Sequence, residues 1–517
     1  MTPKRVVIVG GGTAGWVTAS NMNGALNRDG QKVVDITLIE SPDIPRIAVG
    51  EATFPTIHQI LFNLSLDETE FMKATDATYK HSIKFANWLY NEGEHYHHQF
   101  SRYNPEAVDH YGADWLKSDR TILFADTVSA QPAICDQHLS PKLIGTRQFQ
   151  NPLTYAFHLN ALKFADYLRD VATANGVTHH LENMTEVEMT DDGNIAAVNT
   201  DRGNRYEADL FIDCTGFSAL LIEKKLGIEW DDFSQWLLCD RALVMQVPYE
   251  TYYPGFVRSG TIATALNAGW IWDIPLINRR GVGYVYSSQF ISDDEAELEL
   301  RRYEGAHSDD LPTRIVPFKA GCRKQTWAKN CVAIGLSGGF LEPLESTGIY
   351  LVQLAAMTLA EFFPHHGHME ELADKFNGLM SDRFEEILGF LNMHYCLTRR
   401  TDTEFWLEIA RPERILPALQ ERLDLWRIKP VSKGDFKDLC SAFSYQNHEL
   451  VLFGMDFARD YYAEIYGDDL SAAEIPEVIV KRLEGMQRQL PLHELWLQQT
   501  LGMPEYKKPK QRGSVWD

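Results

Sequence analysis

Three glycines near the N-terminus, Gly10, Gly12 and Gly15, have the spacing of a loop that cradles a pyrophosphate. Four apolar residues directly before them predict a buried strand, and the residues after them predict a helix. In that setting Gly10 permits the tight turn, Gly12 lets backbone N–H groups approach the phosphates, and Gly15 lets the helix pack closely. The loop, completed by Thr13 and Ala14 at the positive end of the helix, therefore predicts a dinucleotide site.

Three further segments indicate which dinucleotide is bound. The strand predicted over 33–39 ends in Glu40, whose carboxylate is placed to accept hydrogen bonds from a ribose. Residues 208–216 predict a strand that runs into a turn of small residues, and 331–336 predict another strand. Both resemble segments that recur in flavoproteins with two dinucleotide-binding domains. We therefore expect the cofactor to be FAD.

The order of predicted strands and helices suggests how these residues are positioned. Strands and helices alternate up to about residue 370, and the pattern beyond is mostly helical. We predict an α/β, doubly wound FAD-binding module over 1–370, of the two-dinucleotide-binding-domain or monooxygenase-like type, with substrate-facing segments embedded in it. A mainly helical C-terminal part, 371–505, is expected to cover the substrate site, and the basic tail 506–517 is expected to be flexible.

Composition narrows the class of partner. The chain has 517 residues and a formal net charge of -23, and an acidic surface repels nucleic acid and anionic membranes. The seven cysteines include no Cys-x-x-Cys pair and predict reduced thiols in a cytoplasmic protein, and no metal site is expected. We expect no signal peptide and, because no apolar run is long enough to span a bilayer, a soluble protein.

Five motifs carry a resemblance to one family. They are 10–16, 49–53, 77–80, the Trp-x-Trp-x-Ile-Pro segment 270–275, and 340–350. On these motifs the chain resembles the flavin-dependent tryptophan halogenases over most of its length up to about residue 400. The resemblance implies an enzyme that uses reduced FAD, O2 and chloride or bromide to make hypohalous acid and halogenate an indole or another electron-rich arene. It also implies cofactor contacts at Gly50, Ala52, Met184, Leu336 and Ile349.

Lys80 matches the catalytic lysine of the family. An amine can hydrogen-bond hypohalous acid or form a haloamine, and burial makes its uncharged form accessible. The alternative is a solvated surface lysine, the commoner fate of this residue type. Ile83, Phe85 and Trp88 follow at spacings that indicate a buried segment and so weaken that alternative. Lys84 is the nearby competitor, but it lacks the motif position.

Glu345 matches the active-site glutamate of the family. It would either orient the halogenating species together with Lys80 or accept the ring proton once halogen has added. A helix is predicted to begin just after Glu345, so a stabilising interaction with the helix dipole is an alternative explanation. Glu342, on the same turn, is the weaker candidate.

Thr347 and Gly348 match the halide site of the family. Free backbone N–H groups at a helix N-terminus form an anion site that needs no side-chain cation. A plain helix cap is the alternative.

Trp270 and Trp272 occupy alternate positions of a predicted strand and therefore point to the same face. In the family this motif lies between flavin and substrate and keeps the organic substrate from ordinary monooxygenation. Composition alone would favour core packing for such a pair, so the gate role comes from the resemblance.

The predicted substrate pocket departs from the family. His98 and Phe100 match one aromatic wall, with a loop of surface histidines as the alternative. On the opposite wall, 435–445 lacks the Tyr-Tyr pair and glutamate that hold the amino-acid part of tryptophan, and Phe443 takes the position of the stacking tryptophan. A pocket without groups for a zwitterion loses selectivity for free tryptophan. We therefore expect an indole or another electron-rich arene, free or carried within a larger molecule.

Two other functions fit parts of the pattern. A flavin-dependent aromatic monooxygenase of the same fold would share the nucleotide motifs, and a flavin-binding protein without catalysis would need neither Lys80 nor Glu345. No separate NADH-binding motif is apparent, so reduced FAD is expected from a separate flavin reductase. The resemblance also suggests a homodimer.

Overall fold

The chain forms two compact units that alternate along the sequence. A computed structural model describes residues 2–28, 30–46, 50–102, 111–436, 441–466 and 470–505, and the predicted tail 506–517 lies outside them. Unit 1 comprises Met1–Asp76, Leu159–Phe233 and Lys319–Glu385, and unit 2 comprises Ala77–His158, Ser234–Phe318 and Glu386–Asp517. These units differ from the contiguous modules 1–370 and 371–505 predicted from the sequence.

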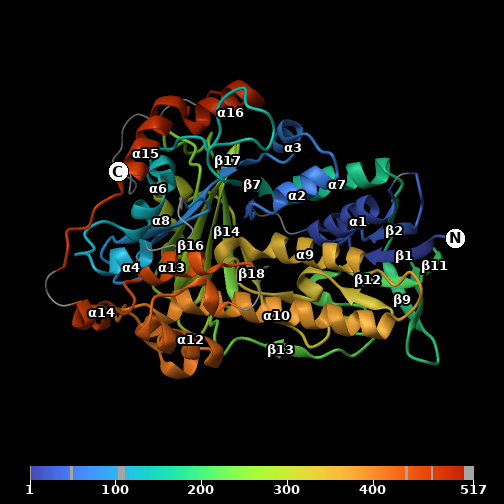
Figure 1. The fold of residues 1–517 in the computed structure, drawn as a ribbon. Coiled ribbons are helices and arrows are strands. Elements are labelled where there is room, and N and C mark those ends of the chain that lie inside the picture. Colours follow the sequence, from blue (N-terminus) through green and yellow to red (C-terminus); the bar gives the residue numbers. More distant parts are fainter. Residues whose placement is uncertain are drawn as a thin grey trace. The chain divides into compact units, whose positions relative to one another are not determined.

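Unit 1 contains a six-stranded sheet with the apolar N-terminal strand near its centre (Figure 1). In sheet order the strands are β20 (Trp327–Ala328), β21 (Cys331–Ala333), β12 (Leu210–Asp213), β1 (Lys4–Val9), β2 (Val34–Glu40) and β8 (Thr178–Leu181). All neighbours are parallel except β20 and β21. Parallel neighbours on both sides and burial of Val6, Val7, Ile8 and Val9 explain the uninterrupted apolar run of β1.

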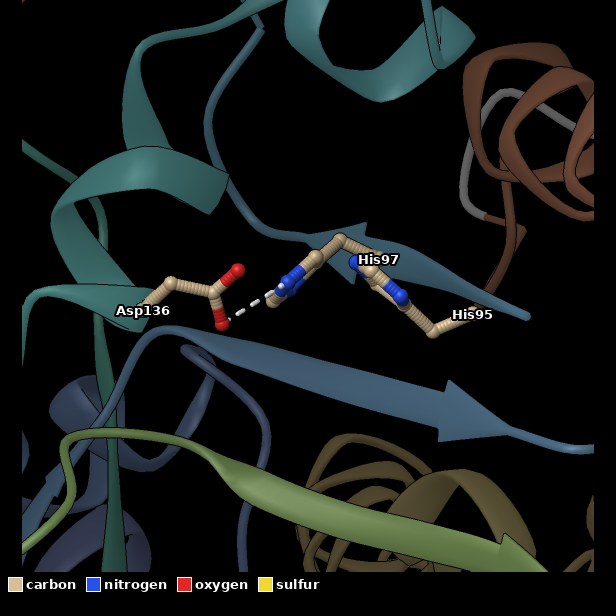
Figure 2. A group of neighbouring side chains, drawn as sticks. All are labelled: His95, His97 and Asp136. Atoms are coloured by element: carbon tan, nitrogen blue, oxygen red, sulfur yellow. Dashed lines mark ion pairs between the residues drawn. The ribbon is translucent and has the colours of Figure 1, made fainter. Parts of the chain in front are cut away.

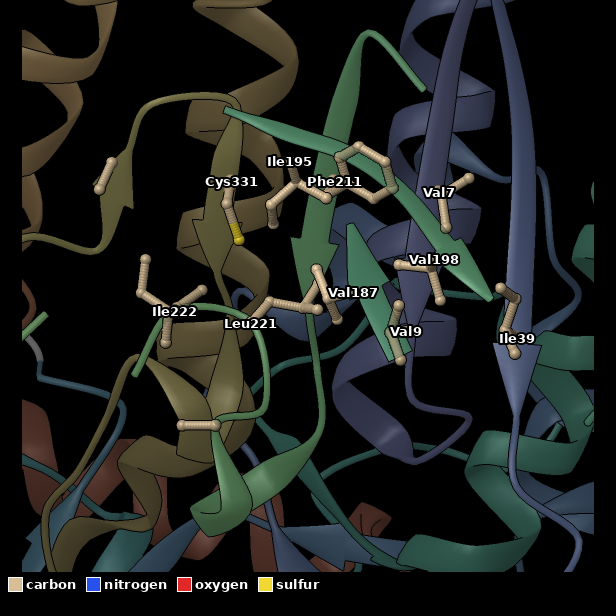
Figure 3. Close-up of a cluster of buried hydrophobic side chains, with 13 residues drawn as sticks. Val7, Val9, Ile39, Val187, Ile195, Val198, Phe211, Leu221, Ile222 and Cys331 are labelled. Atoms are coloured by element: carbon tan, nitrogen blue, oxygen red, sulfur yellow. The ribbon is translucent and has the colours of Figure 1, made fainter. Parts of the chain in front are cut away.

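Helices and a small sheet pack against this parallel sheet. Helix α1 (Thr13–Leu26) contacts β1 and β2 and packs on α7 (Ala161–Ala174) and α9 (Thr347–Glu361). The antiparallel strands β9 (Met184–Met189), β10 (Ile195–Thr200) and β11 (Arg205–Glu207) contribute Val187, Ile195 and Val198 to a core shared with Val7 and Phe211 (Figure 3). The predicted α/β fold is confirmed, with an antiparallel sheet in place of one crossover helix.

The other elements of unit 1 are short. They are β3 (Gly50–Ala52), α2 (Ile57–Asn63), α3 (Glu68–Ala74), β13 (Trp230–Asp232), β19 (Gly321–Arg323), β22 (Gly339–Phe340) and the start of α10 (Met369–Cys396).

Unit 2 is built on a seven-stranded sheet that joins distant parts of the sequence. In sheet order the strands are β18 (Thr313–Pro317), β14 (Arg241–Pro248), β17 (Arg279–Tyr286), β16 (Gly269–Pro275), β15 (Thr261–Ala265), β5 (Ser82–Ala86) and β6 (His95–Gln99). Only β15 and β5 are parallel neighbours in this sheet. Because β5 pairs with β15, an early hairpin is completed by strands encoded far downstream, and this pairing interleaves the units.

Helices make up most of unit 2 beyond residue 386, as the sequence predicted. They are α11 (Glu404–Ile409), α12 (Pro417–Ile428), α13 (Tyr445–Gly454), α14 (Arg459–Tyr466), α15 (Glu477–Gln489) and α16 (His493–Leu501). Earlier segments add α4 (Tyr111–Leu116), α5 (Phe124–Val128), α6 (Gln131–Asp136) and α8 (Asp293–Glu304). Within the described ranges, no helix combines the length and apolar character needed to cross a membrane.

The glycines of the N-terminal loop are required by close contacts. Gly10 has φ of 117°, and a Cβ there would lie 2.2 Å from the carbonyl oxygen of Cys214. A Cβ on Gly15 would lie 1.9 Å from the carbonyl oxygen of Gly10, far inside van der Waals contact. A Cβ on Gly12 would meet nothing within 4 Å. The turn and packing roles predicted for Gly10 and Gly15 therefore have a direct steric cause.

We predict opposite effects of two glycine substitutions on stability. Gly15→Ala forces backbone apart between β1 and α1, and it should lower the free energy of unfolding by more than about 2 kcal/mol and weaken FAD binding. Gly378→Ala, in the exposed interior of α10 with open space around the Cβ, should raise that free energy by about 0.5–1 kcal/mol. Urea unfolding and flavin fluorescence measure both effects. A Gly15→Ala variant with an unchanged free energy of unfolding would contradict the steric role of Gly15.

Candidate active site

The N-terminal loop of unit 1 fits a dinucleotide pyrophosphate. Gly12 occupies the N-cap of α1, so no side chain caps the first turn, and that turn contains no acidic residue. Its backbone N–H groups and the helix dipole therefore favour an anion beside Gly12, where a Cβ would meet open space. Gly335 packs on the same loop, because a Cβ there would lie 2.6 Å from Cβ of Ala14.

Glu40 ends β2, and two side chains of the protein contact its carboxylate. Oε2 lies 3.0 Å from Nε2 of His179, and Oε1 lies 3.7 Å from Nε of Arg46. A Cβ on Gly11 would collide with this carboxylate, so the loop packs directly on Glu40. His179 and Arg46 were not predicted from the sequence. They orient the Glu40 carboxylate, which was predicted to accept hydrogen bonds from a ribose.

The other predicted cofactor residues are scattered over unit 1. Gly50 and Ala52 lie on β3, Met184 begins β9, Leu336 lies in the 3-10 turn Gly335–Ser337, and Ile349 is buried in α9. Between Gly50 and Ala52, burial raises the pKa of Glu51 to about 7. Glu51 can therefore hold or release a proton near neutral pH, which the sequence did not reveal.

The predicted halide residues lie where two left-handed residues lead into α9. Glu345 and Ser346 have φ of 64° and 63°, a region that non-glycine residues rarely adopt. The Ser346 side chain makes no capping hydrogen bond to the helix, Thr347 is buried, and a Cβ on Gly348 would meet open space. The N–H groups of the first turn thus suit a small anion. Glu345, two residues before Thr347 in the sequence, is also buried.

Lys80 is fully buried in unit 2. It ends β4 (Thr78–Lys80), which pairs antiparallel with β7 (Ala156–Asn160) so that Lys80 is opposite Ala156. Its exposed fraction is 0%, and Nζ lies 5.3 Å from the centroid of the Phe100 ring. The ring face stabilises a positive charge on this amine. The surface-lysine alternative is therefore wrong.

Three buried histidines surround β4 and stay neutral at pH 7. Burial is the largest cause of each shift: it lowers the pKa of His81 to about 3, that of His493 to about 4, and that of His158 well below its ordinary value. The charge of Lys80 lowers the pKa of His158 further. These neighbours therefore add no second positive charge beside the lysine.

Hydrogen bonds fix the orientation of His158. The Thr78 hydroxyl donates to the Pro275 carbonyl at 2.7 Å, so it accepts from Nδ1–H of His158 at 3.2 Å. Nε2 of His158 then accepts from the Thr261 hydroxyl at 2.8 Å. Because Pro275 ends the tryptophan motif, one network joins the strand of Lys80 to that motif.

The two tryptophans of the motif lie on β16 and are both buried. Their ring centroids are 6.3 Å apart, which confirms the predicted shared face. The Trp272 ring lies over Gly283 on β17, where a Cβ would come within 2.1 Å of it. Trp270 is 6.3 Å from Trp88, so the pair packs in the core as well. Within the described residues, neither indole N–H has a hydrogen-bond partner.

Asp273 occupies a position that the tryptophan motif leaves unspecified. It is buried and forms ion pairs with two arginines. Its Oδ2 accepts from Arg258 at 2.7 Å and from Arg280 at 2.8 Å. Burial acts to raise the pKa of Asp273, but the two guanidinium groups outweigh it and hold that pKa below its ordinary value. The acid therefore anchors the motif strand.

His98 and Phe443, predicted for opposite walls of the substrate pocket, lie near each other in unit 2 together with a third aromatic residue. His98 is buried on β6, which makes the loop alternative wrong, and it lies 6.2 Å from Phe443 between ring centroids. Phe443 stacks on Phe390 at 3.8 Å with an interplanar angle of 11°. Asn447 Nδ2 lies 2.8 Å from Nε2 of His98. Phe390 and Asn447 were not among the residues predicted from the sequence, and residues 437–440 of the altered segment lie outside the described residues.

A pocket in unit 2 has Phe100 in its lining. Its volume is about 340 Å³. Polar lining residues include Ser101, Arg102, Ser129, Thr154, Gln446 and Arg482. An indole-sized molecule fits such a volume.

Comparisons with known proteins identify the family. Residues 5–468 match the family model described as tryptophan halogenase. Tryptophan 7-halogenase RebH of Lentzea aerocolonigenes is 35% identical over 530 residues, covering 96% of this chain and 98% of that protein. A tryptophan halogenase structure from Shewanella frigidimarina NCIMB 400 has a TM-score of 0.89 at 32% identity and covers 97% and 98% of the two chains. BrvH, a flavin-dependent halogenase from Brevundimonas sp. BAL3, has a TM-score of 0.82 at 32% identity over 96% and 99%.

The parallel sheet and the nucleotide loop define a dinucleotide-binding α/β fold. With these matches over nearly its whole length, the chain belongs to the tryptophan halogenase family. It is a flavin-dependent halogenase, an enzyme class that uses FAD and a halide.

We predict that the protein loses stability as pH falls from 7 to 5. His81, His158 and His493 have depressed pKa values when folded, whereas unfolded histidine titrates near 6.5. Their contribution is therefore present above about pH 6.5 and is lost below it, by up to about 2 kcal/mol each at pH 5. Urea unfolding at several pH values measures the slope. Removal of the exposed His365 should leave the dependence of the unfolding free energy on pH unchanged. An unfolding free energy that does not change with pH in the unaltered protein would contradict the depressed pKa values of the three buried histidines.

Proposed function

We propose that this enzyme halogenates an indole or another electron-rich arene with hypohalous acid that Lys80 delivers. The observation that carries the proposal is an amine with no exposed surface, over the Phe100 ring and among neutral histidines. The overall reaction balances in two steps. FADH2, O2, halide and a proton give FAD, hypohalous acid and water, and the arene and hypohalous acid then give the haloarene and water.

The nucleotide loop and the α9 turn bring the reagents together in this scheme. Backbone N–H groups after Gly10 and Gly12 hold the pyrophosphate, and those at Thr347 and Gly348 hold chloride or bromide. Reduced FAD, when bound, supplies the two electrons that allow O2 to oxidise the halide. A separate flavin reductase provides that reduced FAD, because no NADH-binding motif is apparent in the chain.

Lys80 activates the oxidant. Nζ donates a hydrogen bond to the oxygen of hypohalous acid, which polarises the oxygen–halogen bond towards the arene. The ring carbon forms a bond to halogen while the oxygen leaves and is protonated to water. Glu345 then accepts the proton from the halogenated carbon, which restores aromaticity. Trp270 and Trp272 bar the organic substrate from the flavin, in addition to packing the core.

The substrate class follows from the pocket. Phe100 lines a pocket of about 340 Å³, a volume that accommodates an indole, and His98 and Phe443 form an aromatic pair in the same unit. The segment 435–445 lacks the Tyr-Tyr pair and glutamate that would pair a zwitterion. Without that set, the charges of free tryptophan lose the partners that the family provides, so we infer that a less polar arene is favoured.

We predict that Lys80 is indispensable for turnover and dispensable for flavin binding. Lys80→Met and Lys80→Arg should each lower product formation by at least about 100-fold, because neither side chain offers a primary amine. FAD binding, read by flavin fluorescence, should stay unchanged and reports that the protein is folded. Lys73→Met, an exposed lysine of α3, should keep normal turnover. Product formation by Lys80→Met would contradict the proposed delivery step.

A substrate screen tests the reaction and the substrate class together. With a flavin reductase, NADH, O2 and bromide, we expect brominated indole by mass spectrometry, with kcat/KM at least equal to that for free L-tryptophan. Efficient turnover of L-tryptophan with indole as a poor substrate would contradict the substrate class. Hydroxylated product in the absence of halide would instead support the monooxygenase alternative.

A further inference from the structure

Two histidines and an aspartate of unit 2 form a compact group outside the residues assigned to halogenation. His95 and His97 lie on β6 and Asp136 ends α6, and Figure 2 shows their side chains gathered between these two elements. One ligand atom from each residue lies within 4.8 Å of the others. His97 is buried, His95 is half-buried and Asp136 is exposed, so solvent can reach the group.

This group lies on the face of β6 opposite to the aromatic wall. Successive side chains of a strand point to opposite faces, so His95 and His97 share one face and His98 lies on the other. His95, His97 and Asp136 are therefore not part of the proposed substrate contacts, and they need a separate explanation.

Nε2 of His97 is directed at the carboxylate of Asp136. Nδ1 lies 2.9 Å from the Ser82 hydroxyl, which reaches the His98 carbonyl at 3.4 Å. In the tautomer in which Nδ1–H donates to the Ser82 hydroxyl, Nε2 keeps its lone pair. Nε2 faces Oδ1 of Asp136 at 3.3 Å. In that tautomer a cation between the two atoms would be bound by both lone pairs.

We propose that His95, His97 and Asp136 bind a divalent first-row transition metal ion, with Zn²⁺ as the best fit. Two imidazole nitrogens and one carboxylate oxygen are a donor set that such ions prefer. A tetrahedral ion with bonds of about 2.1 Å holds its ligand atoms about 3.4 Å apart. The 3.3 Å between His97 and Asp136 already matches that spacing, so only the half-buried His95 ring has to move inward.

Lys84 is the internal competitor for the ion. It is opposite His97 in the pairing of β5 with β6, and Nζ lies 3.0 Å from Oδ1 of Asp136. Its side chain is 28% exposed, so the ammonium can swing into solvent when a metal enters. A bound ion would link β6 to α6 and so raise the stability of unit 2.

Metal titration of the full chain, without an affinity tag, tests the proposal. His365, His366 and His368 are exposed and close in sequence, so we use a variant with alanine at all three as the background. Calorimetry with Zn²⁺ should give one site per chain, Co²⁺ should give visible d–d absorption, and Zn²⁺ should raise the melting temperature.

Substitutions in that background distinguish the site from adventitious binding. His97→Ala and Asp136→Asn should each weaken Zn²⁺ binding by at least about tenfold. Lys84→Met should tighten it by about tenfold, because it removes a positive charge from the carboxylate. A gain in affinity cannot come from misfolding. Absence of Zn²⁺ binding in the background protein, or equal binding in His97→Ala, would overturn the proposal.

Discussion

An amine shielded from water is the constraint on which the chemistry proposed for unit 2 depends. Moving an ammonium group out of water costs several kcal/mol unless neighbouring dipoles and hydrogen bonds replace the solvent. Here Phe100 presents a ring face, and His81, His158 and His493 stay neutral. The hydrogen bonds that fix the His158 ring also reach Pro275, so a single polar network sets both the lysine strand and the tryptophan motif.

In the proposed function, unit 1 binds its anions with backbone atoms instead. The starts of α1 and α9 have no capping side chain, and the second start is reached through two residues in the left-handed region. Such residues cost about 1–3 kcal/mol each, and they persist only where surrounding structure over-determines them. Around α9 that support comes from burial of Glu345 and Thr347. Strain at this turn is consistent with a functional role, since a plain helix cap would not need it.

The sequence predicted features whose causes are local. The steric roles of Gly10 and Gly15 and the shared face of Trp270 and Trp272 follow from spacing and strand geometry, and the structure confirms them. Contacts between residues from distant segments of the chain could not be predicted from the sequence. Phe390 comes to Phe443 from α10, and Arg258 and Arg280 reach Asp273 from the loop before β15 and from β17. Pairing of β5 with β15 has no local signal either, which is why contiguous modules were predicted instead of interleaved units.

This interleaving has a consequence for how the chain acquires its structure on the ribosome. The polypeptide passes from one unit to the other after residues 76, 158, 233, 318 and 385. Unit 1 lacks its last segment until residue 385 has emerged, and unit 2 lacks its last segment until synthesis is nearly complete. The early strand β5 must therefore wait for β15 with one edge unpaired, a period in which aggregation competes with folding. For the same reason, no single cut of the gene would yield either unit intact.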